Sequence, residues 1–203
     1  MIEVEQTDGV WTLTLSRADK ANALTRAMLS ALADAVGEAA ASDPAAVILT
    51  GRGRVFSAGA DLDEVQDGLA TDAVWERASS AIANLKCPTI AALNGTVAGG
   101  AFGMVLACDM RVAVIGTKFF YPVMNLGFLP QPSDPKRMRA LVGAGRAAMI
   151  LLAGQKITAE EALSWGLIDR IASDPLAEAH LLAKAAQSAS PAHRAAICDM
   201  VRG

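Results

Sequence analysis

Apolar and polar residues alternate near the start of the chain. The alternation runs from Ile2 to Glu5 and again from Val10 to Leu15, on either side of Thr7-Asp8-Gly9. A period of two residues is typical of strands that bury one face, and turn-forming residues between two such runs favour a hairpin. The pattern therefore predicts two antiparallel strands.

Apolar residues then recur at helical spacing. Met28, Leu29, Leu32 and Val36 fall on one face of a helix, and Thr25 precedes them as a residue type that caps helix N-termini. The charged residues of this segment lie elsewhere around the circumference, so the helix is predicted to be amphipathic. A short apolar run over residues 46–50, followed by glycine, indicates a buried strand.

Helices and strands continue to alternate along the rest of the chain. Thr158 and Glu161 fit a capping box, and Asp174 followed by Pro175 is a typical N-cap with a first-turn proline. No fixed-period repeat, low-complexity linker or charge run divides the chain, so we expect one α/β domain. Further helices are expected over 72–85, 101–107, 136–141, 158–165 and 175–189, and further strands over 89–93 and 110–115.

Composition narrows the classes of function. Of the 203 residues, 53% are hydrophobic and 19% are charged, which excludes an intrinsically disordered chain. Aromatic residues make up only 4%, and the formal net charge is -3. The chain therefore has neither stacking platforms for single-stranded nucleic acid nor a basic field for phosphate backbones, and we expect no nucleic acid partner.

One uncharged segment is long enough to raise the question of a membrane span. It runs from Cys87 to Cys108, but Pro88, Asn94 and several glycines interrupt it, so we interpret it as a buried strand, a glycine turn and a buried helix. The three cysteines match neither a disulfide framework nor a zinc motif, and the first residues lack the pattern of a secretory signal. We expect a cytoplasmic protein with no metal and no membrane partner.

Two glycine-containing loops carry the candidate chemistry. One covers residues 56–61 and the other residues 94–101, and each follows an apolar strand and precedes a helix. Backbone N–H groups at such turns can point toward a developing negative oxygen, and the N-terminus of the following helix adds positive potential. The loops either form an oxyanion hole together or use their glycines only for tight turns.

Other catalytic arrangements have less support. Gly51-Arg-Gly53 lacks the third glycine of a dinucleotide-binding loop, and no phosphate-loop lysine pattern occurs. His180 and His193 both fall in the C-terminal helices, more than a helix away from any Cys or carboxylate cluster. This placement disfavours a metal site and a serine hydrolase triad built on Ser57.

Short motifs over residues 10–171 match one known family in order and in spacing. These motifs are Arg17, Asn22-Ala-Leu24, Val47-Ile-Leu-Thr-Gly51, Phe56-Ser-Ala-Gly-Ala-Asp-Leu62, Pro88-Thr-Ile-Ala-Ala-Leu-Asn-Gly95, Gly99-Gly100, Cys108-Asp109, Leu126-Gly127 and Gly166-Leu-Ile-Asp169. In them the chain resembles the crotonase superfamily, also called the enoyl-CoA hydratase/isomerase family. The resemblance implies a spiral of ββα units that binds acyl-CoA thioesters and stabilises their enolates. It also implies an acyl-CoA-binding core over residues 1–172 and a short helical region over 173–203.

The resemblance also implies roles for individual positions. The backbone N–H groups of Ala60 and Gly100 take the places of the family's two oxyanion donors. Coenzyme A enters as part of the substrate and not as a separate cofactor. A homotrimer or a dimer of trimers is expected, although only a short helical tail follows Ile171. The residues implied to contact coenzyme A are Arg17, Lys20, Ala21, Ala58, Ala60, Asp61, Leu62 and Gly100, with Arg17 or Lys20 near the 3′-phosphate.

Two positions depart from the hydratases of this family. Hydratases carry glutamates that activate and deliver water on the helix after the glycines and after the next proline, where this chain has Gly103 and Val123. Neither residue can transfer a proton. The sequence therefore predicts an isomerase or another enolate-forming enzyme of fatty acid metabolism rather than a standard hydratase. The alternative is a non-catalytic or regulatory protein that kept the acyl-CoA site.

A substitute proton-transfer group is expected in the segment that lines the family's acyl pocket. Tyr121, Asn125, Gln131 and Asp134 lie in this segment, and Asp134 is the only carboxylate among them. We therefore assign the general base to Asp134. Its place just before Pro135 also fits a helix N-cap, and Tyr121 fits either a hydrogen-bond donor or an ordinary buried strand residue.

Overall fold

The predicted hairpin forms one edge of the larger of two β-sheets. The computed structural model describes residues 1–203, and its larger sheet has the strand order β1-β2-β3-β5-β7-β10. β1 and β2 are antiparallel, and all the other neighbours in this sheet are parallel. The α/β class is therefore confirmed. The strands are β1 (Ile2–Thr7), β2 (Val10–Leu15), β3 (Ala46–Gly51), β5 (Thr89–Leu93), β7 (Met110–Ala113) and β10 (Arg170–Ile171).

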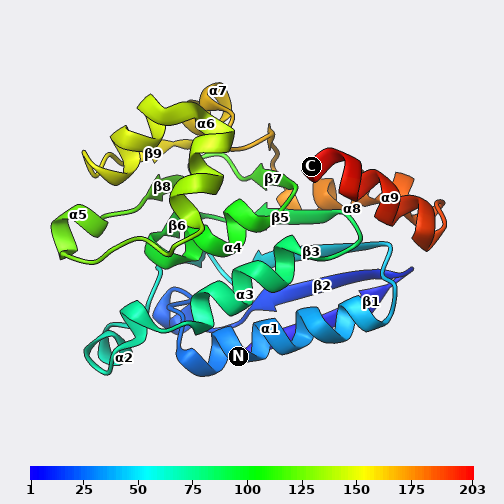
Figure 1. Ribbon diagram of the computed structural model, residues 1–203, viewed down its shortest axis with the longest axis horizontal. Coiled ribbons are helices and arrows are strands. Elements are labelled where there is room, and N and C mark those ends of the chain that lie inside the picture. The colour runs from blue at the N-terminus through cyan, green and yellow to red at the C-terminus, as the bar shows by residue number, and fades with distance from the viewer.

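The two faces of this sheet enter two separate hydrophobic clusters. Val47 and Leu49 of β3 belong to the larger cluster, whereas Ile48 between them belongs to the smaller one. Helices α1 (Arg26–Ala41), α3 (Val74–Ala83) and α4 (Phe102–Ala107) contribute to the larger cluster, and α8 (Pro175–Gln187) packs on the opposite face against β3 and β5 (Figure 1). Because both faces are covered, the central strands are apolar on both sides, which is the pattern that predicts them.

Three local helix signals that rest on capping residues are confirmed. The Thr25 hydroxyl accepts a hydrogen bond from the Met28 N–H at 3.1 Å and caps α1. Thr158 and Glu161 make both bonds of the capping box at the start of α7 (Ala159–Trp165). The Asp174 carboxylate accepts two backbone N–H groups at the start of α8.

The sequence does not predict the smaller sheet. Its strand order is β4-β6-β8-β9, and β4, β6 and β8 are parallel. Each strand has only two or three residues, too few to show a period in the sequence. The strands are β4 (Val55–Ser57), β6 (Thr96–Ala98), β8 (Lys118–Phe120) and β9 (Ile157–Thr158).

The remaining helices lie at both ends and at the top of the molecule in Figure 1. α2 (Leu62–Gln66) and α5 (Val123–Leu126) lie at the same end, and α9 (Pro191–Arg202) follows α8. α6 (Asp134–Leu151) extends beyond the predicted helix over 136–141 and is kinked at Gly143, where φ is 79°. None of the helices combines the length and the apolar character that crossing a membrane requires.

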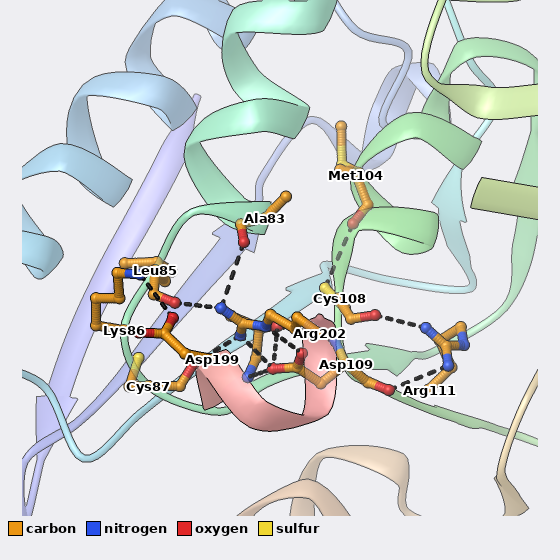
Figure 2. A network of polar contacts seen from close by, with 11 residues as sticks. Ala83, Leu85, Lys86, Cys87, Met104, Cys108, Asp109, Arg111, Asp199 and Arg202 are labelled. Atoms are coloured by element: carbon orange, nitrogen blue, oxygen red, sulfur yellow. Dashed lines mark hydrogen bonds and ion pairs between the residues drawn. The ribbon is translucent and has the colours of Figure 1, made fainter. Parts of the chain in front are cut away.

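Arg202 fastens the last helix to the core. Its guanidinium donates to both oxygens of Asp109, from Nε to Oδ1 at 2.7 Å and from Nη2 to Oδ2 at 2.6 Å. The same group donates to three backbone carbonyls between residues 83 and 87 (Figure 2). Asp109 also accepts hydrogen bonds from the N–H and hydroxyl of Thr89. Burial raises the pKa of Asp109, but the hydrogen bonds from Arg202 and Thr89 outweigh it and leave the pKa below its usual value.

We expect Arg202→Ala to lower the free energy of unfolding by about 1–3 kcal/mol at neutral pH, because Asp109 then lacks its cation. Since the folded-state pKa of Asp109 is lowered, this stabilisation is complete above the unfolded-state pKa of about 4 and is lost as the pH falls further. Urea denaturation from neutral to acidic pH measures the difference, which shrinks in acid.

Lys86→Ala is the matched control. It removes the exposed ion pair between Lys86 and Asp199, and Asp199 lies on α9 together with Arg202. Its effect is expected to stay below about 1 kcal/mol. A loss for Arg202→Ala no larger than that of the control would contradict the role given to Arg202.

Candidate active site

Each candidate loop includes residues of a short parallel strand of the smaller sheet, β4 in the loop over 56–61 and β6 in the loop over 94–101. The loop after β4 leads to α2, and the loop after β6 leads through a 3-10 turn at Gly99–Ala101 to α4. β4 and β6 are hydrogen-bonded neighbours, so their carboxyl ends lie side by side. Crevices outside the carboxyl ends of parallel strands are the usual ligand sites of α/β folds.

Ala60 is held by one parallel bridge to Leu24. The Leu24 N–H donates to the Gly59 carbonyl at 2.7 Å, and the Asp61 N–H donates to the Leu24 carbonyl at 2.9 Å. In such a bridge, Leu24 bonds to the two residues that flank Ala60, and the N–H of Ala60 itself points away from Leu24. This N–H is free of a backbone partner.

Close approach requires glycine at two positions of these loops. Gly59 has a φ of 92°, and a Cβ there would lie 2.8 Å from the carbonyl oxygen of Ala98. A Cβ on Gly100 would lie 2.8 Å from the indole ring of Trp75, whose N–H is fixed by the Leu69 carbonyl at 2.8 Å. Trp75 is a site residue that the sequence does not reveal, because its local pattern is that of any buried helical residue.

The two loops border an apolar cavity of about 170 Å³. No charged side chain lines this cavity. A developing negative charge inside it would therefore find its stabilisation in backbone dipoles rather than in cationic side chains. The loops contribute Ala58, Ala60, Gly99 and Gly100, and the other walls include Trp75, Phe120, Tyr121, Val123, Phe128 and Gln131.

The two positions that carry glutamate in the hydratases have different surroundings. Val123 lines the cavity and makes that part of the wall apolar. Gly103 lies near the start of α4, and a Cβ there would lie 3.2 Å from Oδ1 of Asp134. The carboxylate of Asp134 thus occupies the space into which a side chain at position 103 would project.

Asp134 is fully buried and lies behind the cavity wall. Its Oδ2 accepts a hydrogen bond from the Tyr121 hydroxyl at 2.9 Å, while Oδ1 has no partner. The pKa of Asp134 is raised to about 7, chiefly by burial. The hydrogen bond from Tyr121 and the charge of Arg137 lower this pKa, and the charge of Glu76 raises it. Tyr121 lines the cavity, whereas Asp134 does not.

The alternative interpretation of Asp134 as a helix N-cap is wrong. Ser133 is the N-cap residue of α6, and its N–H and hydroxyl donate to the Glu76 carboxylate at 2.9 and 2.6 Å. Glu76 belongs to α3, so the partner that completes this helix start is distant in sequence. Asp134 is the first helical residue, and its side chain is free to enter the interior.

The residues implied to contact coenzyme A fall into two groups. Ala58, Ala60, Leu62 and Gly100 line the cavity. Residues 17–21 lie in or next to a 3-10 turn of the preceding loop and do not line it.

Arg17 and Asp61 join these two groups. An Arg17 Nη1 to Asp61 Oδ2 bond of 2.5 Å connects them and holds the pKa of Asp61 below its usual range. The other Asp61 oxygen accepts backbone N–H groups at the start of α2. Lys20 is exposed, and the Ala21 beside it has a φ of 49°. Arg17 therefore already has an anionic partner, whereas Lys20 extends into solvent.

Ser57 has a structural role in these contacts. Its hydroxyl donates to the Asn22 carbonyl at 2.8 Å and accepts from the Gly59 N–H at 3.1 Å. His180 and His193 lie on α8 and α9 and line none of the cavity. No group of three or more His, Cys, Asp or Glu residues is arranged to hold a metal ion.

The architecture is that of the crotonase fold. A solved enoyl-CoA hydratase/isomerase from Pseudoalteromonas atlantica superimposes with a TM-score of 0.92 at 33% identity, over 100% of this chain and 82% of that chain. An enoyl-CoA hydratase structure from Bacillus anthracis gives a TM-score of 0.92 at 28% identity, over 100% of this chain and 82% of that chain. Residues 5–202 match the enoyl-CoA hydratase/isomerase family model, and the chain belongs to this family.

Relatives in sequence carry more than one activity in their names. 4-Chlorobenzoyl coenzyme A dehalogenase-2 from Arthrobacter sp is 35% identical, over 85% of this chain and 66% of the dehalogenase. A Mycobacterium leprae protein described as probable enoyl-CoA hydratase echA6 is 34% identical, over 84% of this chain and 71% of its own length. The chain thus spans about two thirds of the length of these relatives.

We expect Asp134→Asn to remove a pH-dependent loss of stability. The folded-state pKa is raised to about 7, so the folded protein keeps a proton that the unfolded chain releases above about pH 4. The wild-type free energy of unfolding therefore falls as the pH rises from about 4 to 7 and then levels off. Over this range the Asn variant gains up to about 4 kcal/mol relative to the wild type.

Chemical denaturation at acidic and mildly alkaline pH measures this gain. Asp34→Asn makes the same chemical change at an exposed position of α1 and serves as the control. A difference between wild type and Asp134→Asn that does not change with pH would contradict the buried, proton-holding state of Asp134.

Proposed function

We propose that this chain binds an acyl-CoA or enoyl-CoA thioester and stabilises the enolate form of its acyl group. The observation that carries the proposal is the convergence of the Ala60 and Gly100 loops on one uncharged cavity at the ends of β4 and β6. A thioester oxygen placed between the two backbone N–H groups gains negative charge as the adjacent C–H bond is broken. Losing one donor of such a hole typically costs about 2.7–4 kcal/mol of transition-state stabilisation.

The proposed reaction is an isomerisation or another enolate-forming conversion, and not hydration. Addition of water needs groups that activate the water and deliver its proton, and Gly103 and Val123 provide neither. An isomerase moves a proton from one carbon to another and needs only one such group. Asp134 is the proposed proton acceptor, because it is a buried carboxylate hydrogen-bonded to a side chain of the cavity wall.

The proposed coenzyme A path runs along the two groups of residues described above. The backbone and small side chains at Ala58, Ala60 and Leu62 border the thioester end. Lys20 is proposed for the 3′-phosphate, because it is exposed, whereas Arg17 is held by Asp61. Ala21 and Asp61 fix the loop between these ends through backbone and capping contacts.

A non-catalytic acyl-CoA-binding protein is the second candidate function. The absence of any charged side chain from the cavity wall favours it, because most proton-transfer residues are ionisable. Binding of an acyl-CoA without exchange of its α-protons would distinguish this candidate from the enzyme.

A cytoplasmic homo-oligomer acting in fatty acid metabolism is the setting we propose. Three buried free cysteines are compatible with a reducing compartment. Leu62 and Leu129 at the cavity mouth and Met200 on α9 are exposed, and apolar side chains of this kind often lie in interfaces between copies.

Butyryl-CoA is expected to bind with a dissociation constant of 1 mM or tighter, where about 1 mM corresponds to a binding free energy of only about -4.1 kcal/mol. Gly100→Ala should weaken binding at least about tenfold, because the new methyl group displaces Trp75 or the loop. Isothermal titration calorimetry measures both affinities.

Gly37→Ala is the control variant. It adds a methyl group in open space on α1 and should bind butyryl-CoA like the wild type. Absence of binding of both CoA and butyryl-CoA to the wild type at millimolar concentration would refute the proposal.

Hydration of crotonyl-CoA is expected to be at least about 10²-fold slower than with a hydratase that has both glutamates, because each such group commonly contributes about 10²–10⁴-fold. Loss of the ultraviolet absorbance of the enoyl thioester follows the reaction. Robust hydration would mean that a different pair of groups activates water and that the assignment of Gly103 and Val123 is wrong.

A further inference from the structure

Asp134 has no direct path to a ligand in the cavity. Its side chain is 0% exposed, and it does not belong to the cavity wall. Tyr121 is one of the residues that line the cavity, and its hydroxyl donates to Oδ2 of Asp134 at 2.9 Å. A proton that passes between the cavity and Asp134 along existing contacts therefore passes through Tyr121.

Three contacts hold the Tyr121 ring in place. The ring is stacked on Phe102 with a centroid distance of 5.4 Å and an interplanar angle of 17°. Its oxygen accepts the Gln131 N–H at 3.3 Å while its proton is directed to Asp134. Phe102 is the first residue of α4, which follows directly on the Gly100 turn. The phenol is thus fixed relative to the proposed oxyanion donor.

We infer that Tyr121 is the residue that exchanges a proton with the bound acyl group, and that Asp134 is a positioning residue that accepts and returns the proton through Tyr121. The inference rests on the proposed function and adds the group that meets the substrate. It also gives a reason for the unusual burial of a carboxylate beside Gly103, where an acidic side chain would otherwise be an unfavourable choice.

The transfer balances as a coupled movement of two protons. The α C–H bond of the thioester breaks, its electron pair forms the enolate, and its proton forms a new O–H bond at Tyr121. The original hydroxyl proton of Tyr121 moves at the same time to Oδ2 of Asp134. Tyr121 ends as a neutral phenol, Asp134 ends as a neutral acid, and the negative charge has moved to the enolate oxygen between the Ala60 and Gly100 amides. Return of the proton to another carbon reverses these movements.

The charges around the pair favour this coupled transfer over a free tyrosinate. Burial raises the pKa of Tyr121, and the Asp134 charge raises it further. Asp134 itself faces Tyr121, Glu76 of α3 and Arg137 of α6, and with a pKa of about 7 it can hold or release a proton near neutral pH. The unpartnered Oδ1 leaves the carboxylate without a second donor that would lower its basicity.

Exchange of the α-protons of butyryl-CoA in D₂O, followed by mass spectrometry, tests the inference. Tyr121→Phe keeps the ring stack and removes only the oxygen, and Asp134→Asn keeps an acceptor for the Tyr121 hydroxyl. Each variant is expected to lower exchange about 100-fold or more with unchanged butyryl-CoA affinity by calorimetry. The double variant should be no slower than either single variant, because both residues act in one transfer.

Thr50→Val is the control variant. Thr50 lies in β3, away from the cavity, and its buried hydroxyl donates to the Ala92 carbonyl at 2.8 Å. Removing this hydroxyl should leave the exchange rate like that of the wild type.

The pH profile distinguishes proton transfer from a structural role. Wild-type exchange should rise as Asp134 loses its proton near pH 7, and this rise should be absent in Asp134→Asn. Wild-type exchange rates in Tyr121→Phe would overturn the inference and leave the proposed function intact. Binding of butyryl-CoA to the wild type without exchange would also overturn it and would favour the non-catalytic candidate. Failure of the wild type to bind butyryl-CoA would refute the proposed function and the inference with it.

Discussion

The close approach of two backbone loops is the constraint on which the site depends. At Gly59 there is no room for a Cβ, because the Ala98 carbonyl oxygen would lie 2.8 Å away. This contact brings the end of β4 against the end of β6, and the parallel pairing of the two strands fixes the direction in which both loops leave the sheet. The two loops thereby meet at one cavity, and no charged side chain lines it. In the proposed oxyanion hole, the Ala60 donor is held by a β-bridge to Leu24 and the Gly100 donor belongs to the 3-10 turn that precedes α4, so both are fixed by the fold.

The buried carboxylate of Asp134 is separated from the cavity by side chains of the cavity wall. Tyr121 and Val123 form the wall on one side, and the buried carboxylate of Asp134 lies behind Tyr121. Burying an ionisable group in this position reduces stability above neutral pH, so the arrangement is unfavourable for folding alone. The same burial keeps its proton affinity in the range useful for acid–base chemistry. The proposed proton transfer would account for a residue that packing alone would replace with an apolar one.

Elements that depend on neighbouring residues can be predicted from the sequence. The hairpin of β1 and β2, the Thr25 cap and the Thr158 capping box follow from local patterns, and the buried strands β3 and β5 follow from continuous apolar runs. The placement of the Ala60 and Gly100 loops comes from family motifs, and the structure brings both to one cavity.

Features that depend on distant residues cannot be predicted in this way. The strands of the smaller sheet are too short to have a period, and their pairing is set by the whole fold. Ser133 and Asp134 give a local N-cap signal, but the acceptor at this helix start is Glu76, from a helix far upstream. Arg202 meets Asp109 across an even longer distance in sequence. Trp75 becomes a site residue only because Gly100 packs against its ring.

The proton resonances of two backbone amides test the central claim most directly. Titration of ¹⁵N-labelled protein with crotonyl-CoA should shift the Ala60 and Gly100 amide protons downfield more than any others, because both donate to the thioester oxygen. Binding with these two resonances unchanged, while amides elsewhere in the cavity shift, would show that the oxygen lies at another position and would contradict the proposed oxyanion hole.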